Sequence, residues 1–342
     1  MSRTLHLDFS VPADLSRAAM LLRDGGLVAF ATETVYGLGA NALSPDAVAG
    51  IFAAKKRPSW DPLIVHLASV EQLDQIARVP AAVAGRVSAL ADAFWPGPLT
   101  LLLPRSSAVP DAVTAGRELV GVRVPAHPAA RALLAAAGIP VAAPSANLFG
   151  HTSPTTAAHV LADLDGRIDA VLDAGPTSIG VESTVLDPTQ TPMVLYRPGA
   201  VTAEQLTTVT GVAVEVFVPT TAARPAAMPS PGVGIRHYAP RARLVLVEGS
   251  LEALQTALEE AEAADEDGKI GVLLPEGWTL NADAAIQRWG QWNDPEALAA
   301  GLFAGLRALD DCGVSVILCP LPEAGGIRDA IRDRLQKAAR LA

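Results

Sequence analysis

The sequence predicts an α/β fold divided into two domains. Short apolar runs alternate with helical patterns along most of the 342 residues, which is typical of strands followed by helices. Half of the residues are hydrophobic and 18% are charged, so the chain can bury an ordinary core and is not of the disordered class. A proline-rich stretch at 218–240 interrupts the alternation, and a chain of this length is typical of two domains.

We expect the first domain to span residues 1–213. The apolar stripe over 12–26 predicts a helix that ends at two glycines, and the apolar run at 27–31 predicts a buried strand. Residues 32–40 resemble a polar, glycine-bearing turn, and Ser44–Pro45 opens a helix that runs through Lys55. Further strands are expected at 62–67, 99–103, 119–124, 139–143, 169–172, 183–187 and 193–196, and further helices at 69–77, 80–93, 127–137, 155–163 and 202–209.

Residues 214–242 are predicted to be a linker, because their prolines disfavour both helix and central strand. No acidic residue lies between Glu215 and Glu248, although Arg224, Arg236, Arg241 and Arg243 do. Two interpretations are open: the segment contacts an anionic group, or it is a solvated tether.

The second domain is expected over residues 243–342, as a smaller Rossmann-like α/β unit. Apolar runs predict strands at 244–247, 270–274 and 314–319. Helical patterns lie between and after them, at 250–264, 295–310 and 326–341.

Charge and motifs exclude several classes of protein. A net charge of −10 argues against a general nucleic-acid coat protein, which needs a basic face. Cys312 and Cys319 lack the spacing of a zinc site, and a disulfide scaffold is not expected. The N-terminus does not resemble a secretory signal and no apolar run is long enough to span a membrane, so we expect a cytoplasmic protein. The phosphate-loop, GxGxxG, HExxH and GxSxG motifs are absent.

Several polar groups follow the predicted strands. The segment Thr32–Gly39 offers hydroxyls, a carboxylate and glycines suited to a small polar ligand, or forms an ordinary polar turn. Lys55, Lys56 and Arg57 end a helix, where they suit phosphate or the helix dipole. Arg123 lies within an apolar strand, which requires either a carboxylate ligand or an internal salt bridge.

Further polar residues accompany the next apolar runs, at 143–147 and 182–184. Another cation, Arg197, directly follows the predicted strand at 193–196. Ser153–Pro154–Thr155 suits either a helix start or a phosphate site. Together these groups predict a pocket for an anionic small molecule. Without an evident Ser-His or Cys-His nucleophile, its chemistry would depend on positioning and charge stabilisation.

At these residues the sequence resembles the YrdC-like family, in the long two-domain form that makes L-threonylcarbamoyladenylate. The resemblance rests on an ordered series of motifs and extends over nearly the whole chain. The motifs are TETVYGLGANA, KKRPSWDPLIVH, FWPGPLTLLLP, GVRVPAHP, APSANLFGHTSPT, ESTVLD and YRPGA, followed by SPGVGIRHYAP and the C-terminal segment that contains GGIRDAI.

The resemblance implies a fold and an activity. The fold is a twisted mixed sheet with a central pocket, followed by a Rossmann-like C-terminal domain. The activity joins L-threonine, bicarbonate and ATP, with Mg²⁺, into threonylcarbamoyl-AMP and pyrophosphate. A tRNA threonylcarbamoyl transferase then uses the product on the adenosine beside the anticodon. Direct tRNA binding by this chain is left open.

The resemblance also implies roles for individual residues. Lys55 and Arg57 form the KxR motif and are expected to be catalytic, and no protein ligand of a metal is assigned. The linker would act as a lid. L-Threonine would contact Thr34, His66, Arg123, Ser183 and the backbone at Ala143; ATP would contact Arg57, Asp61, Ser145, Asn147, Ser153, Arg197 and Tyr238.

Two alternatives belong to different classes. One is a carbamoyltransferase-type domain that forms carbamoyl-AMP from carbamoyl phosphate and ATP. The other is an RNA-binding module, against which the net charge and the lack of interleaved aromatic and basic residues argue.

Overall fold

The computed structural model describes residues 3–218, 228, 230, 237–264, 269–281 and 284–340. The chain divides into two compact units. One comprises Met1–Phe149, Pro154–Ser178 and Glu182–Gly234, and the other comprises Gly150–Ser153, Ile179–Val181 and Ile235–Ala342. Two short segments of the predicted first domain therefore group with the C-terminal residues.

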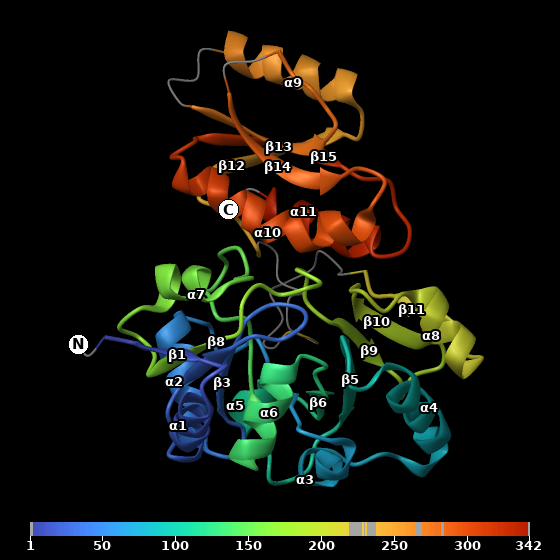
Figure 1. The fold of residues 1–342 in the computed structure, drawn as a ribbon. Helices are drawn as coiled ribbons and strands as arrows, with labels where there is room; N and C mark the ends of the chain where they lie inside the picture. The colour runs from blue at the N-terminus through green and yellow to red at the C-terminus, as the bar shows by residue number, and fades with distance from the viewer. Residues whose placement is uncertain are drawn as a thin grey trace. The chain divides into compact units, whose positions relative to one another are not determined.

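The first unit is a mixed α/β structure, as predicted (Figure 1). Its strands are β1 (Leu5–Asp8), β2 (Val28–Phe30), β3 (Gly37–Asn41), β4 (Ile64–His66), β5 (Leu99–Pro104), β6 (Leu119–Arg123), β7 (Val141–Ala142), β8 (Ala170–Asp173), β9 (Thr184–Asp187), β10 (Met193–Arg197) and β11 (Val214–Val216). They form one eleven-stranded sheet in the order β1-β8-β2-β3-β7-β4-β6-β5-β9-β10-β11.

Several helices of this unit begin at a proline or at a capping side chain, and the start predicted at Ser44–Pro45 is confirmed. Ser44 caps α2 by accepting from the amide of Ala47, and Thr202 forms a capping box with Gln205 at the start of α8. The helices are α1 (Pro12–Arg23), α2 (Pro45–Lys55), α3 (Leu73–Ile76), α4 (Ala84–Phe94), α5 (Asp111–Thr114), α6 (Pro128–Ala137), α7 (Ala157–Leu164) and α8 (Ala203–Thr210), with 3-10 turns at Val70–Gln72 and Ala81–Val83.

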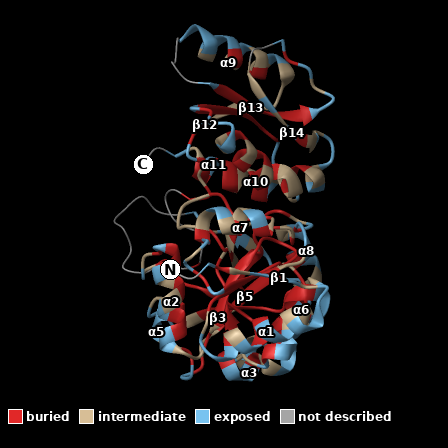
Figure 2. Ribbon diagram, turned by 60° about the vertical axis from the view of Figure 1, so that its left-hand side comes forward, coloured by how far each residue is buried: buried red, intermediate tan, exposed pale blue. Residues whose placement is uncertain are grey.

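Apolar side chains cover both faces of the sheet. Along β2, Ala29 and the following Ala31 face one core cluster, while Val28 and Phe30 face the other, as the two-residue repeat of a strand requires. Helices α1 and α6 pack on the Phe30 side, and α2, α4, α7 and α8 contribute to the cluster that contains Ala29. Buried residues accordingly fill the strands and the inner helix faces (Figure 2).

Two predictions for this unit were wrong. Residues 37–41 form β3 rather than part of a turn, because they pair with β2 on one side and β7 on the other. A Cβ on Gly39 would lie 2.9 Å from both Phe30 Cε1 and Val141 Cγ1, so a side chain would not fit there. Val214–Val216, inside the predicted linker, extend the sheet as β11. Much of that linker, including Arg224 and Arg236, lies outside the described residues.

The second unit contains a four-stranded parallel sheet in the order β12-β15-β13-β14. Its strands are β12 (Arg243–Glu248), β13 (Ile270–Glu276), β14 (Ala285–Gln291) and β15 (Val316–Leu321), and its helices are α9 (Leu251–Ala263), α10 (Pro295–Asp311) and α11 (Arg328–Ala338). Leu254 and Leu258 of α9 pack on β12, β13 and β15 in one core. The edge strand β14 was not predicted from the sequence.

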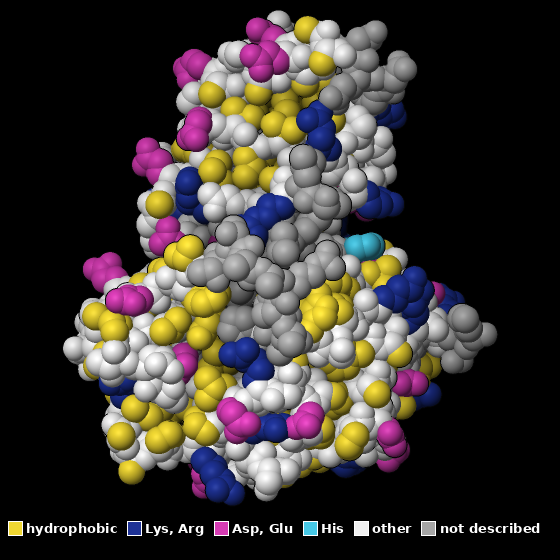
Figure 3. All heavy atoms as spheres, turned by 180° about the vertical axis from the view of Figure 1, so that it is seen from behind, with side chains coloured by type: hydrophobic (Ala, Val, Ile, Leu, Met, Phe, Trp, Pro, Cys, Tyr) yellow, Lys and Arg dark blue, Asp and Glu magenta, His cyan; other side chains and the backbone are white. Residues whose placement is uncertain are grey.

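Charged side chains are mixed on the surface. On the face seen in Figure 3, the described basic and acidic side chains are interspersed. Among the described helices, none combines the length and apolarity required to cross a membrane.

Candidate active site

The polar motifs of the first unit meet because three of them are hydrogen-bonded to one another. The amide of Leu38 donates to Pro144 O at 2.7 Å and the amide of Ala146 donates to Tyr36 O at 2.8 Å, so TETVYG and APSAN lie side by side. The amide of Ala143 donates to Ile64 O at 2.9 Å, which joins APSAN to β4. The amide of Ala143 is therefore engaged within the sheet, and the predicted backbone contact with a ligand falls to its carbonyl.

The predicted site residues do not all lie at one edge of the sheet. Strand β4 is antiparallel to β7 and parallel to β6, so His66 is paired with Val141 and with Arg123. Ser145, beyond the other end of β7, instead forms a bridge with Gly37. The site therefore has two neighbouring groups of side chains.

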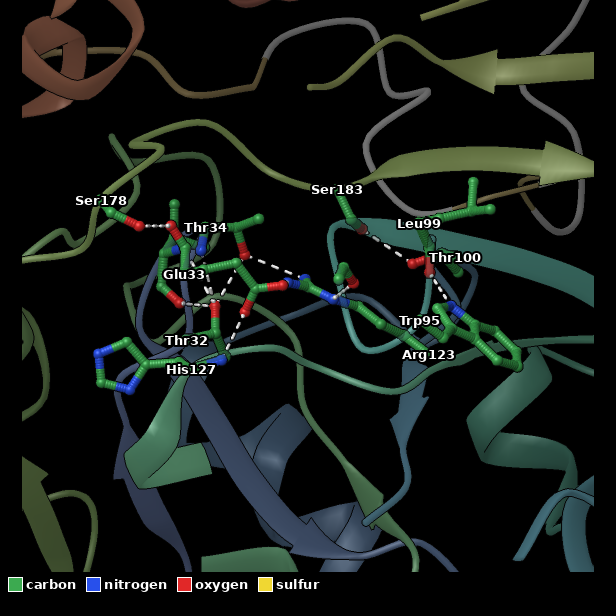
Figure 4. A network of polar contacts seen from close by, with 12 residues as sticks. Thr32, Glu33, Thr34, Trp95, Leu99, Thr100, Arg123, His127, Ser178 and Ser183 are labelled. Carbon is green, nitrogen blue, oxygen red and sulfur yellow. Dashed lines mark hydrogen bonds and ion pairs between the residues drawn. The ribbon is translucent and has the colours of Figure 1, made fainter. Parts of the chain in front are cut away.

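Arg123 lies at the centre of the first group. Its Nη2 donates to Glu33 Oε1 at 2.5 Å, its Nη1 to Thr34 Oγ1 at 3.0 Å, and its Nε to Gly97 O at 3.1 Å (Figure 4). Both Arg123 and Glu33 are buried. The internal salt bridge that the sequence left as one alternative is therefore present. Burial raises the pKa of Glu33, but the adjacent guanidinium outweighs burial and holds this pKa below its usual value.

His66 borders this group in a defined protonation state. Its Nδ1 is 3.2 Å from Ile64 O, and because a carbonyl only accepts, Nδ1 carries the proton and Nε2 presents a lone pair. Burial, followed by the charge of Arg123, lowers the pKa of His66 to about 3. The imidazole is therefore a neutral acceptor at physiological pH.

Ser183 and Arg197 form a further contact. Arg197 Nε donates to Ser183 O at 2.9 Å and its Nη2 to Ser183 Oγ at 3.1 Å. Thr100 Oγ1 lies 2.8 Å from the same hydroxyl (Figure 4). The charge of Arg197 contributes to the pKa values of both His66 and Asp61. Arg197 is therefore within electrostatic reach of both groups of side chains.

The second group is built on Lys55 and Arg57. Lys55 Nζ donates to Ser145 O at 2.6 Å and to Asn147 O at 2.5 Å. Burial and the neighbouring Arg57 hold the pKa of Lys55 well below its usual value. These contacts make Lys55 a support for the 145–147 segment; its predicted catalytic role stays a prediction.

Arg57 and Asp61 form a buried ion pair, with Nη2 3.0 Å from Oδ2. Arg57 also donates to Asp61 O and Pro62 O and lies over the ring of Phe149. Burial raises the pKa of Asp61, against the opposing charges of Arg57 and Lys55. The second oxygen, Oδ1, is buried and has no hydrogen-bond partner within the described part of the chain.

Two predicted nucleotide contacts, Ser153 and Tyr238, belong to the second unit, whereas the other predicted site residues belong to the first. The ring of Tyr238 is 1% exposed, with its centroid 5.8 Å from that of Phe303 and 5.2 Å from the guanidinium carbon of Arg334. In this structure Tyr238 is thus a packed residue of the second unit.

The residues that hold Arg123 and Ser183 in place were not predicted from the sequence. Gly97 and Thr100 lie in the motif FWPGPLTLLLP, which carried the family resemblance, but no property of the motif indicated that they contact Arg123 and Ser183. Glu33 was noted as a carboxylate of the polar segment, without its partner.

Comparisons with known proteins identify the family of the chain. A family model described as "Telomere recombination", for Sua5, YciO and YrdC, matches residues 20–199, and one described as "Threonylcarbamoyl-AMP synthase, C-terminal domain" matches 201–340. The chain is 45% identical over 329 residues to a threonylcarbamoyl-AMP synthase of Bacillus subtilis, covering 95% of this chain and 92% of the relative. It is 43% identical over 324 residues to one of Pyrococcus abyssi, covering 94% and 93%.

A solved structure is also similar throughout. Pyrococcus abyssi Sua5 complexed with L-threonine matches with a TM-score of 0.89 and 42% identity, over 99% of this chain and 98% of that one. Both parts of the chain are thus covered by one type of relative. The chain belongs to the YrdC-like family, in its two-domain form.

Proposed function

We propose that this chain is a threonylcarbamoyl-AMP synthase, which converts L-threonine, bicarbonate and ATP into threonylcarbamoyl-AMP and pyrophosphate. The observation that supports it best is the buried, pre-positioned guanidinium of Arg123, in a chain similar from end to end to a Sua5 complexed with L-threonine. An arginine held in a buried pocket is suited to a carboxylate ligand.

The first group of side chains would bind the amino acid. Arg123 binds the α-carboxylate, with Thr34 and Ser183 beside it. The lone pair on His66 Nε2 accepts a hydrogen bond from the amino group or the side-chain hydroxyl of threonine. The backbone carbonyl of Ala143 would complete this side of the pocket.

The second group would bind ATP. Arg57 and Arg197 supply positive charge, and Ser145 and Asn147 supply polar groups on the segment that Lys55 supports. Ser153 and Tyr238 remain predicted nucleotide contacts.

Mg²⁺ is expected to accompany ATP. In the part of the chain that the structure describes, no three His, Cys, Asp or Glu side chains are grouped as a metal site. Magnesium typically takes phosphate oxygens, waters and one or two carboxylates, and the buried Oδ1 of Asp61 could supply one carboxylate oxygen. Asp61 would therefore hold the ion, which would offset the charge of the triphosphate.

The chemistry follows from positioning. The amino group of threonine adds to the carbon of CO2 or bicarbonate to give a carbamate, with water lost in the bicarbonate case. A carbamate oxygen then forms a bond to the α-phosphorus, and the bond from that phosphorus to the oxygen that bridges the α- and β-phosphates breaks, so that the β- and γ-phosphates leave as pyrophosphate. The buried cations Arg57 and Arg197 stabilise the negative charge on the phosphates. No covalent enzyme intermediate is required.

We further propose a cytoplasmic location and transfer of the product to a tRNA threonylcarbamoyl transferase. Both stay predictions, as does the lid role of the linker. Direct binding of tRNA is left open.

Pyrophosphate release from ATP and Mg²⁺ tests the proposal. The full chain is assayed with and without bicarbonate, across a panel of amino acids, and the adenylate product is identified by mass spectrometry. Release that requires both L-threonine and bicarbonate is expected. Release that requires carbamoyl phosphate instead would assign the chain to the carbamoyltransferases, and absence of release would contradict an adenylating enzyme.

A further inference from the structure

The carboxylate of Glu33 lies in the site but has no role in the chemistry derived above. We infer that Glu33 is a positioning residue, which sets the orientation of the Arg123 guanidinium and so determines how tightly the amino-acid substrate binds. The inference rests on the proposed function, because it takes L-threonine as the ligand of Arg123.

Three partners fix the guanidinium in three directions. Glu33 Oε1, Thr34 Oγ1 and Gly97 O each accept from a different nitrogen of Arg123 (Figure 4). A guanidinium has five N–H donors, so these three bonds leave one N–H on each Nη for other acceptors. Two N–H groups are the number that a carboxylate engages in a bidentate pair.

Glu33 is itself held in place. The amide of His127 lies 3.4 Å from Oε2, and the hydroxyl of Ser178 lies 3.4 Å from the Glu33 carbonyl oxygen. Thr32 Oγ1 lies 2.7 Å from Thr34 Oγ1 and accepts from the amide of Val35, which orders the same turn (Figure 4). The carboxylate is therefore a fixed reference point for the arginine.

A fixed arginine is valuable because its long side chain otherwise loses much rotamer freedom when a ligand binds. Gly97 and Thr34 orient one part of the guanidinium, but the bond to Glu33 alone fixes Nη2 among the described contacts. Without it, Arg123 could turn away from the substrate carboxylate. Threonine affinity would then fall, whereas ATP affinity would not.

Three variants of the full chain distinguish the effect of the length of the Glu33 side chain from the effect of its charge. Glu33→Ala removes the acceptor, Glu33→Asp keeps the charge but shortens the side chain, and Glu33→Gln keeps an acceptor oxygen at the original reach. Asp111→Ala is the matched control, because it breaks an exposed ion pair, with Arg105, elsewhere in the same unit. Pyrophosphate release gives KM for each substrate, and threonine binding is measured separately by calorimetry.

We expect Glu33→Ala and Glu33→Asp to raise KM for L-threonine about tenfold or more, since neither side chain reaches Arg123 Nη2 and the hydrogen bond that orients it is lost, with KM for ATP within about twofold. Glu33→Gln should stay within about threefold of the unmodified protein. If Glu33→Ala does not fold, the inference is tested by comparing KM for L-threonine between Glu33→Asp and Glu33→Gln. Equal rises in both KM values, or an unchanged KM for threonine in Glu33→Asp, would overturn the inference. An unmodified chain that shows no threonine-dependent release would instead refute the proposed function.

Discussion

The ammonium group of Lys55 lies 2.6 Å from the main-chain oxygen of Ser145. A second bond, to Asn147 O, and the bond from Phe149 N to Lys55 O make the end of α2 and the 145–149 segment one connected structure. The lysine of the KxR motif thus contacts backbone that carries two predicted ATP-binding side chains. A cation in this position can affect nucleotide binding without touching the nucleotide.

Lys55→Met should therefore lower stability and weaken ATP binding together. Methionine preserves most of the side-chain volume, but it leaves the buried carbonyl of Asn147 and the partly buried carbonyl of Ser145 without their donor, which costs about 1–3 kcal/mol. Urea unfolding gives the free energy of unfolding of each variant. The KM values for ATP and for L-threonine show whether nucleotide binding is weakened selectively. Lys56→Met is the control, because Lys56 is the adjacent, exposed residue. Equal stability of the two variants would contradict the supporting role of Lys55.

Arg123→Ala should reduce L-threonine binding more than ATP binding. The lost bond to a carboxylate is worth about 1.5–3 kcal/mol, so threonine affinity should fall by about tenfold to a hundredfold. Calorimetric titration of each ligand separates the two effects, with Arg105→Ala, which removes an ion pair to an exposed aspartate, as the control. An equal loss of both ligands would argue against this assignment of Arg123.

Much of the fold could be predicted from the sequence, because most strands are apolar and most helices have clear starts. Strand β3 could not, since Gly37, Gly39 and Asn41 are typical turn residues, and only the close approach of Phe30 and Val141 explains the glycine at 39. Edge strand β14 (Ala285–Gln291) was missed because Gln287, Arg288 and Gly290 interrupt its apolar residues, so that no apolar run marks it.

Only part of the site could be predicted, because local sequence patterns do not show which distant residues pair in the fold. Arg123 in an apolar strand indicates that a partner exists, but its partner Glu33 lies 90 residues away in sequence, where no local pattern marks the pairing. In addition, polar residues at the carboxyl ends of the strands gather at one edge only when the strands are parallel, and this sheet is mixed. His66 lies at the end of one predicted strand and Ser145 follows another, yet those strands, β4 and β7, are antiparallel.

His66 predicts a dependence of stability on pH. Its pKa is lowered from 6.5 to about 3 in the folded protein. Above pH 6.5 neither state takes up this proton. As the pH falls from 6.5 towards 3, the unfolded chain binds it and the folded chain does not, so stability is lost, by up to about 1.4 kcal/mol per pH unit.

The variant His66→Asn removes this titration while keeping an N–H that can donate to Ile64 O. Urea unfolding of both proteins between pH 8 and pH 4.5 should give a constant difference in free energy at high pH. Below about pH 6 the stability of the unmodified protein should fall more steeply than that of the variant. Parallel curves throughout would show that the folded protein binds the proton as readily as the unfolded chain.

Gly199 offers a steric test of the turn beside Arg197. A Cβ there would lie 2.3 Å from Thr184 N and 2.7 Å from the carbonyl carbon of Ser183, and these backbone atoms cannot move aside without disturbing the Ser183–Arg197 contact. Gly199→Ala should therefore lose about 1–3 kcal/mol of stability and lower kcat/KM as well.

The control is Gly85→Ala in α4, where nothing lies within 4 Å of the added carbon. There alanine should be neutral or stabilise by up to about 1 kcal/mol, because it favours helix. Chemical unfolding compares the two variants, and similar stabilities would mean that the Gly199 turn can relax to admit a side chain.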